Sequence, residues 1–85
     1  MNITEQRDMM LASCKMKTEQ VIYGAYPGYK QLNIIRQGSG YTQQDIVSMN
    51  AFIDAVRARC DHYEAVISAA EDPSEIIIDY SDIKP

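Results

Sequence analysis

The sequence predicts a mainly α-helical protein, a helical hairpin or small three-helix bundle with one long helix in its C-terminal half and an extended, strand-like C-terminal arm. Three observations lead to this prediction. Apolar side chains follow a heptad pattern over residues 42–70. Glycine and proline separate that stretch from two earlier helical stretches, and residues 72–85 become acidic and β-branched. A chain of 85 residues is expected to form one small domain with little room for a deep core.

Residues 2–23 predict the first helix, because Asn2 and Glu5 have the spacing of a capping box and no glycine or proline occurs before Gly24. Four of the five methionines lie in this stretch or just before it: Met1, Met9, Met10 and Met16. Methionine fills irregular gaps in a core and also serves adaptable binding surfaces. A loosely specified core face is the favoured interpretation, and a partner-binding face is the alternative.

The segment GAYPG at residues 24–28 interrupts the helical pattern. Pro27 lacks the N–H that a continuous helix needs, but it suits the first turn of a new helix. Residues 27–37 therefore predict a short helix, with Leu32 and Ile35 on one face and Ile34 beside them. Gly38 is well placed for a left-handed C-cap, and the short loops favour antiparallel neighbours.

Residues 42–70 predict one long amphipathic helix, with Thr42 as the N-cap that accepts from the backbone N–H of Asp45. Its large apolar residues recur at alternating steps of three and four: Ile46, Met49, Ile53, Val56, Cys60, Tyr63, Ile67 and Ala70. We call this set the heptad seam. Phe52 and Val66 widen its apolar face.

A stripe of small residues lies roughly opposite the heptad seam: Ala51, Ala55, Ala58, Ala65 and Ala69. Alanine is the best helix former and fills solvent-facing positions at little cost, which is the favoured interpretation. The alternative is that a second helix packs closely on this side in an assembly.

Residues 72–85 form an acidic C-terminal arm in which Glu75 to Tyr80 has the composition of a β-strand. We find no partner strand in the sequence, and a lone strand leaves its backbone groups unpaired. Four interpretations stay open: pairing with a second copy, addition to a partner's sheet, an extended arm, and a frayed acidic tail with a few apolar anchors.

The net charge of −4 comes entirely from residues 71–85, because residues 1–70 hold seven basic and seven acidic side chains. The chain thus lacks the basic footprint of nucleic-acid binding, and no nucleic-acid partner is expected. No apolar run approaches the roughly 18 residues of a transmembrane helix, and no signal peptide is evident, so neither a membrane partner nor secretion is expected.

Cys14 and Cys60 are too few for a disulfide scaffold and have no CxxC spacing. Both are interpreted as packing residues, and a regulatory disulfide between them is the less favoured alternative in a reducing cytoplasm.

No constellation of residues indicates catalysis. His62 is the only histidine and has no carboxylate on its face, no group has metal-ligand spacing, and the glycines at 38 and 40 are not part of a phosphate-binding motif. We therefore expect no catalytic, cofactor or metal site, and no enzyme. Four tyrosines flank the interrupted region, and packing of the loops is favoured over contact with a partner: Tyr23, Tyr26, Tyr29 and Tyr41.

Residues 26–38 (YPGYKQLNIIRQG) resemble segments of the form aromatic-Pro-x-aromatic-Lys-Gln-Leu-Asn-Ile that precede a long helix in small bacteriophage tail proteins. Residues 49–60 (MNAFIDAVRARC) continue this resemblance, which covers about residues 20–70 and brings no catalytic motif. In such phage proteins the pattern accompanies tail-fibre or tailspike proteins and their assembly helpers. The resemblance implies a phage or prophage protein that is either an assembly chaperone or a structural component of the virion.

The sequence therefore predicts a non-enzymatic phage protein that binds tail-fibre or tail subunits and forms a homo-oligomer. It would act in the host cytoplasm during assembly, with the virion tail as a second location. A small acidic regulatory module that docks on a host protein is the alternative. The interface candidates are apolar and aromatic residues: Ile46, Met49, Phe52, Ile53, Val56, Tyr63, Ile67, Tyr26, Tyr29, Ile76, Ile77 and Ile78.

Overall fold

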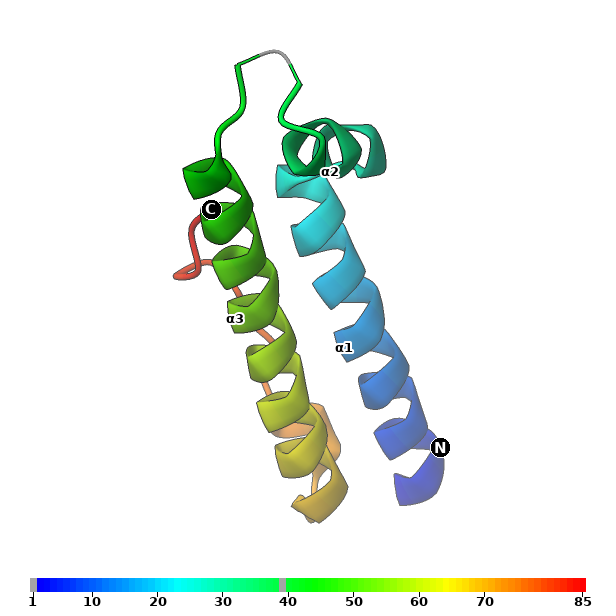
Figure 1. The fold of residues 1–85 in the computed structure, drawn as a ribbon. Coiled ribbons are helices and arrows are strands. Elements are labelled where there is room, and N and C mark those ends of the chain that lie inside the picture. The colour runs from blue at the N-terminus through cyan, green and yellow to red at the C-terminus, as the bar shows by residue number, and fades with distance from the viewer. Residues whose placement is uncertain (1, 39) are drawn as a thin grey trace.

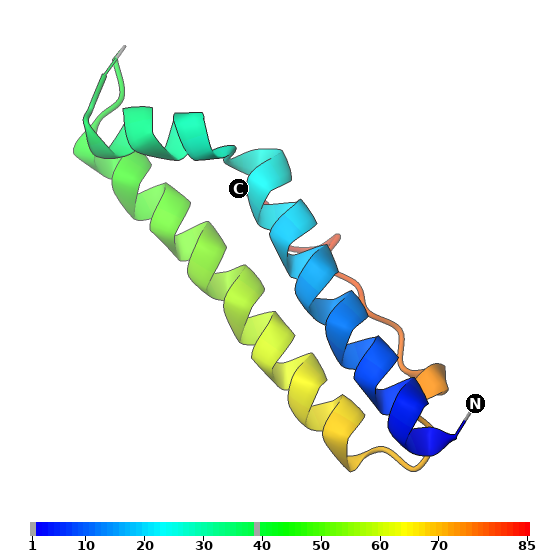
Figure 2. The same ribbon diagram turned by 90° about the vertical axis from the view of Figure 1, so that its right-hand side faces the viewer.

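The computed structural model describes residues 2–38 and 40–85 and confirms a mainly helical fold (Figure 1). The elements follow in the order α1 (Ile3–Ala25), α2 (Gly28–Ile35), α3 (Gln43–Ala69) and the short 3-10 helix η1 (Pro73–Glu75). Helices α1 and α3 lie side by side and antiparallel, and α2 crosses one end of this hairpin (Figure 2). No residue in the two described ranges belongs to a β-strand.

Helix α1 begins as its cap predicts, because the Asn2 side chain accepts from the backbone N–H of Glu5 at 2.9 Å. It ends two residues later than predicted, since the helix continues through Gly24 to Ala25. Glycine in a helix is only moderately costly, whereas the residue before a proline is disfavoured in the helical conformation. Pro27, rather than Gly24, therefore ends α1, with Tyr26 as the C-cap.

Helix α3 has the predicted N-cap at Thr42, whose hydroxyl accepts from the N–H of Asp45 while the Asp45 carboxylate accepts from the N–H of Thr42 at 2.7 Å. Its other end is capped from α1. The Arg7 guanidinium donates to the carbonyl oxygens of Ile67 at 3.2 Å and Ala70 at 2.8 Å. A cation at the negative end of a helix stabilises it, so this contact joins the two long helices at the open end of the hairpin.

Helix α2 ends at a left-handed residue, but that residue is Gln37, with φ of 54°, and not Gly38 as predicted. The N–H of Gly38 donates to Asn33 at 2.9 Å and that of Gln37 donates to Ile34 at 3.0 Å, which are the two hydrogen bonds of a Schellman motif. The left-handed residue thus comes one position earlier than predicted, and the helix, predicted over 27–37, spans Gly28–Ile35. Glycine's conformational freedom is used at Gly40 instead, where φ is 87°.

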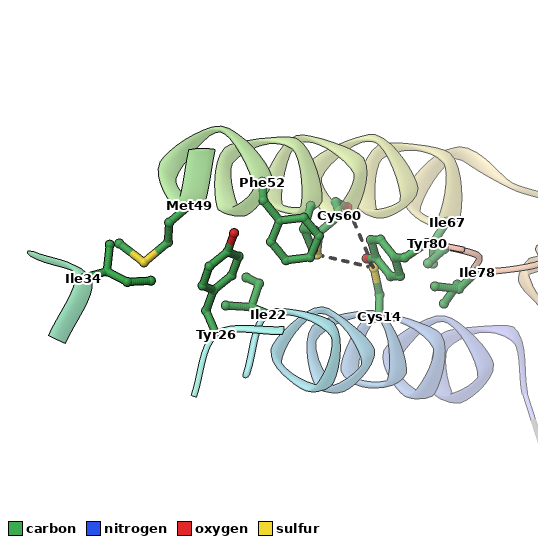
Figure 3. Close-up of a cluster of buried hydrophobic side chains, with 11 residues drawn as sticks. Cys14, Ile22, Tyr26, Ile34, Met49, Phe52, Cys60, Ile67, Ile78 and Tyr80 are labelled. Carbon is green, nitrogen blue, oxygen red and sulfur yellow. Dashed lines mark hydrogen bonds between the residues drawn. The ribbon is translucent and has the colours of Figure 1, made fainter. Parts of the chain in front are cut away.

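The core runs along the line where α1, α3 and the C-terminal arm meet (Figure 3). From α3 it takes Phe52 and the heptad seam from Ile46 to Ile67, and each of these seam residues is at least half-buried. From α1 it takes Cys14, Thr18 and Ile22, which are spaced by four residues and share one helix face. At the α2 end, Ile34 and Met49 point toward one another and are each 2 % exposed.

The C-terminal arm turns back at η1 and runs along both long helices without pairing with a strand. Its side chains alternate, as an extended chain requires: Ile78 and Tyr80 are buried, whereas Ile77 and Asp79 face outward. The arm therefore packs on the core of its own chain, together with α1 and α3.

Candidate interaction surface

The interface candidates chosen from the sequence lie mostly inside the monomer. All but two are buried in the core or half-buried against it: Tyr26, Ile46, Met49, Phe52, Ile53, Val56, Tyr63, Ile67, Ile76 and Ile78. Only Tyr29 and Ile77 are exposed, at 74 % and 81 %. The heptad seam that predicted association with another helix thus meets α1 and the arm of the same chain.

Helix α2 carries the exposed apolar surface that adjoins Tyr29. Tyr29, Leu32 and Ile35 are spaced by three residues and therefore lie on one helix face, and all three are exposed. We call these three side chains the α2 face. The sequence placed Leu32 and Ile35 together, but it could not show that Ile34 beside them is the residue that enters the core.

The α2 face is held outward by contacts on the opposite side of the helix. Ile34 is buried against α3, and the Gln31 side-chain amide donates to the carbonyl oxygen of Tyr26 at 2.7 Å. The Lys30 ammonium lies 5.3 Å from the centre of the Tyr26 ring, within the range of a cation–π contact. Tyr26 is itself buried with its ring 5.6 Å from that of Phe52. These contacts orient α2 with Ile34 toward the core.

The segment that contains α2 carries a net positive charge. Residues 20–44 contain Lys30 and Arg36 but no aspartate or glutamate. The opposite end of the hairpin holds the start of α1 and the segment at η1, which carry most of their charge as carboxylates: Glu5, Asp8, Glu71, Asp72 and Glu75. A positively charged segment that also exposes an apolar face is complementary to an apolar surface with acidic side chains nearby.

A second exposed apolar row follows α1. Met9, Met16 and Tyr23 repeat every seven residues and are all exposed, whereas Met10 is half-buried against the core. The interpretation of the methionines as a core face therefore holds for Met10 and not for Met9 or Met16. The residues between them on this row are mostly polar, so it is less continuous than the α2 face.

The alanine stripe of α3 faces outward along its whole length in this monomer. The tyrosines near the interrupted region do not form one cluster: Tyr26 is buried, Tyr41 packs half-buried against the core, and Tyr23 and Tyr29 are exposed. In the described part of the chain, the aromatic ring pairs join Tyr26 to Phe52 and Tyr63 to His62 and Tyr80.

A buried polar cluster lies at the middle of the hairpin. The hydroxyls of Tyr80 and Thr18 share a hydrogen bond of 2.7 Å, and the Tyr80 oxygen lies 3.5 Å from the sulfur of Cys14. The sulfurs of Cys14 and Cys60 are 3.4 Å apart. Burial is the main cause that raises the pKa of the Cys60 thiol to about 11 and the pKa of Tyr80 above its usual range, so both groups are neutral at physiological pH.

Within residues 2–38 and 40–85, no set of three histidine, cysteine, aspartate or glutamate side chains is arranged to hold a metal ion. None of the described helices has the length and apolar character needed to cross a membrane. Comparison of the chain with family models, with curated proteins and with solved structures gave no match.

Proposed function

We propose that this protein is a non-enzymatic bacteriophage protein that binds other proteins during tail or tail-fibre assembly, as a chaperone or small structural adaptor. The observation that supports binding is the α2 face. It places three large apolar side chains in solvent at one end of the hairpin, and contiguous exposed apolar surface commonly marks a protein–protein interaction site.

The phage part of the proposal rests on the resemblance of residues 26–38 and 49–60 to small phage tail proteins. In the first of these segments, two kinds of residue can be separated. Tyr26, Gln31 and Ile34 hold α2 on the hairpin, whereas Tyr29 and Leu32 point away from the core and are available to a partner. Residues of the second segment form the middle of α3, which supports that hairpin.

The proposed partner is a phage tail or tail-fibre subunit with an apolar surface bordered by acidic side chains. Such a surface complements the α2 face and the net positive charge of residues 20–44, which contain it. Assembly in the host cytoplasm, with the virion tail as a second location, fits this role.

The test is co-purification of the chain with the tail and tail-fibre subunits of the phage or prophage that encodes it. Leu32→Asp introduces a charge into the centre of the α2 face, and we expect it to weaken binding at least about tenfold, as loss of a central apolar contact does. Met16→Asp is the matched control, because Met16 and Leu32 are similarly exposed, at 60 % and 57 %. The control is expected to bind as the wild type does.

Equal binding by Leu32→Asp and the wild type would overturn the role of the α2 face, and loss of binding in Met16→Asp alone would transfer it to α1. Failure of every tail and tail-fibre subunit to bind would overturn the tail-assembly role.

The alternative, an acidic module that docks on a host protein, needs an available C-terminal tail. Ile78 and Tyr80 are buried in the core, and Asp82 pairs with Arg59 at 2.7 Å. The tail is thus largely engaged within the monomer, so this alternative has less support.

A further inference from the structure

Cys14 and Cys60 come from the middles of the two long helices and meet inside the core. They are separated by 46 positions in the sequence, yet their sulfurs are only 3.4 Å apart. Both are free thiols, 0 % and 6 % exposed. A disulfide needs a sulfur–sulfur distance of about 2.05 Å, so a small side-chain movement separates this contact from a covalent bond.

Two features of the surroundings determine access to the thiol pair. On one side, Tyr80 of the arm covers Cys14, and its hydroxyl is held by Thr18 (Figure 3). On the other side, a groove of about 230 Å³ between α1 and α3 includes Cys60 in its lining, together with the charged residues Lys15, Glu19 and Arg57. Cys60 is therefore the thiol that lies nearer to solvent, while Cys14 stays covered by the arm.

We propose that Cys14 and Cys60 are a modification site at which a low-molecular-weight disulfide, such as glutathione disulfide, oxidises the pair to an intramolecular disulfide that joins α1 to α3. This inference goes beyond the proposed function and does not depend on it. The bond forms where the surrounding thiol pool is oxidising, and the pair stays reduced in a reducing cytoplasm.

The reaction is two successive thiol–disulfide exchanges. The Cys60 thiolate attacks one sulfur of glutathione disulfide, the reagent's sulfur–sulfur bond breaks, and the first glutathione leaves as a thiolate. The Cys14 thiolate then attacks the Cys60 sulfur of the mixed disulfide and displaces the second glutathione. The two cysteines together lose two electrons and two protons. These reduce glutathione disulfide to two molecules of glutathione thiol.

The cross-link has a defined structural consequence. It ties the centres of α1 and α3, which stabilises the hairpin because it restricts the unfolded chain. The hydrogen bond between Tyr80 and Thr18 does not involve either sulfur, so the arm keeps this attachment in the oxidised protein.

The test is to refold the reduced, full-length chain from denaturant in a buffer of reduced and oxidised glutathione, trap the thiols with an alkylating reagent, and digest with trypsin without reduction. Refolding is used because burial raises the pKa of Cys60 to about 11, which makes exchange in the folded protein slow. Trypsin cuts after Arg7, Lys15 and Arg59, so the disulfide joins residues 8–15 to residues 60–85.

We expect a monomer 2 Da lighter than the reduced chain, with the joined peptide as the main product even at a roughly tenfold excess of reduced over oxidised glutathione. Its thermal unfolding midpoint should exceed that of the reduced chain by at least about 10 °C. Cys14→Ser and Cys60→Ser, as matched controls, should yield mixed disulfides with glutathione or dimers instead. If the refolded wild type keeps two free thiols or forms mixed disulfides with glutathione, the proposal is overturned. A joined peptide whose formation lowers the thermal unfolding midpoint would overturn it too.

Discussion

At the residue scale, Arg59 joins the C-terminal arm to α3 through three hydrogen bonds. Its guanidinium donates to both carboxylate oxygens of Asp82, at 2.9 and 2.7 Å, and to the carbonyl oxygen of Asp79 at 3.0 Å. The Tyr63 hydroxyl adds a fourth contact, donating to the Asp79 carbonyl oxygen at 2.9 Å. This bidentate geometry suits arginine and not lysine.

The same contact determines how Asp82 titrates. The hydrogen bonds from Arg59 are the main cause that holds the pKa of Asp82 below its ordinary value of 3.8. Because the folded pKa is depressed, the stabilisation that this carboxylate gives is complete above the unfolded pKa and is lost as the pH falls through the folded pKa. The contribution is therefore constant at neutral pH and disappears only in acid.

We expect the carboxyl carbon of Asp82, followed by NMR, to titrate with a midpoint below 3.8 in the wild type. In Arg59→Gln the midpoint should rise toward the ordinary value, because the guanidinium is gone. Arg57→Gln removes the same charge two residues away on the same helix, outside that contact, and should leave the midpoint unchanged. An Asp82 midpoint that is the same in Arg59→Gln and the wild type would contradict this assignment.

At the element scale, the arm shows how an extended segment can complete a helical core without a sheet. Neighbouring isoleucines in it have opposite environments, since Ile78 is 9 % exposed and Ile77 is 81 % exposed. The β-branched composition predicted an extended, strand-like arm, and the arm alternates in burial, but it packs against the two long helices and pairs with no strand in the described part of the chain.

We expect Ile78→Ala to lower the free energy of unfolding by about 2–4 kcal/mol, because it removes buried methyl groups and leaves a cavity. Ile77→Ala makes the same chemical change at an exposed position and should change it by less than about 0.5 kcal/mol. Urea unfolding of both variants measures the difference. Similar values for the two would mean that the arm does not pack as the structure describes.

At the scale of the whole molecule, the chain is a thin rod. Its extents are 51 × 18 × 16 Å and its radius of gyration is 15.7 Å, against about 12 Å for a compact chain of this length. In a thin shape each long helix has a side that faces solvent. On α3 this side carries the alanine stripe, and on α1 it carries the exposed row of Met9, Met16 and Tyr23.

Small-angle X-ray scattering of the monomer, identified by a mass of 9.6 kDa, is expected to give a radius of gyration close to 15.7 Å. A value near 12 Å, typical of a compact globule, would contradict the single extended hairpin. The same experiment measures the mass at higher concentration, which tests the homo-oligomer predicted from the heptad seam.

The local signals in the sequence were sufficient for the helices and several of their ends. Thr42 with Asp45 and Asn2 with Glu5 form caps through side chains only three residues apart, so the caps are local events. The heptad seam also predicted the buried side of α3, because its period is sustained over many turns. The buried side of the short α2 could not be predicted in this way. Its eight residues are too few for the spacing to show that Ile34, and not Leu32 or Ile35, is the buried side chain.

By itself, therefore, the sequence determined that the chain is helical, where its long helices lie and which face of α3 is buried, because those properties depend on neighbours within a turn or a heptad. Only the tertiary structure decided what covers that face. It brought α1 and the arm onto the heptad seam, placed Cys14 beside Cys60, and left the α2 face in solvent. Such contacts join residues far apart in the chain, and they follow from how the whole set of apolar faces is packed, which no local pattern specifies.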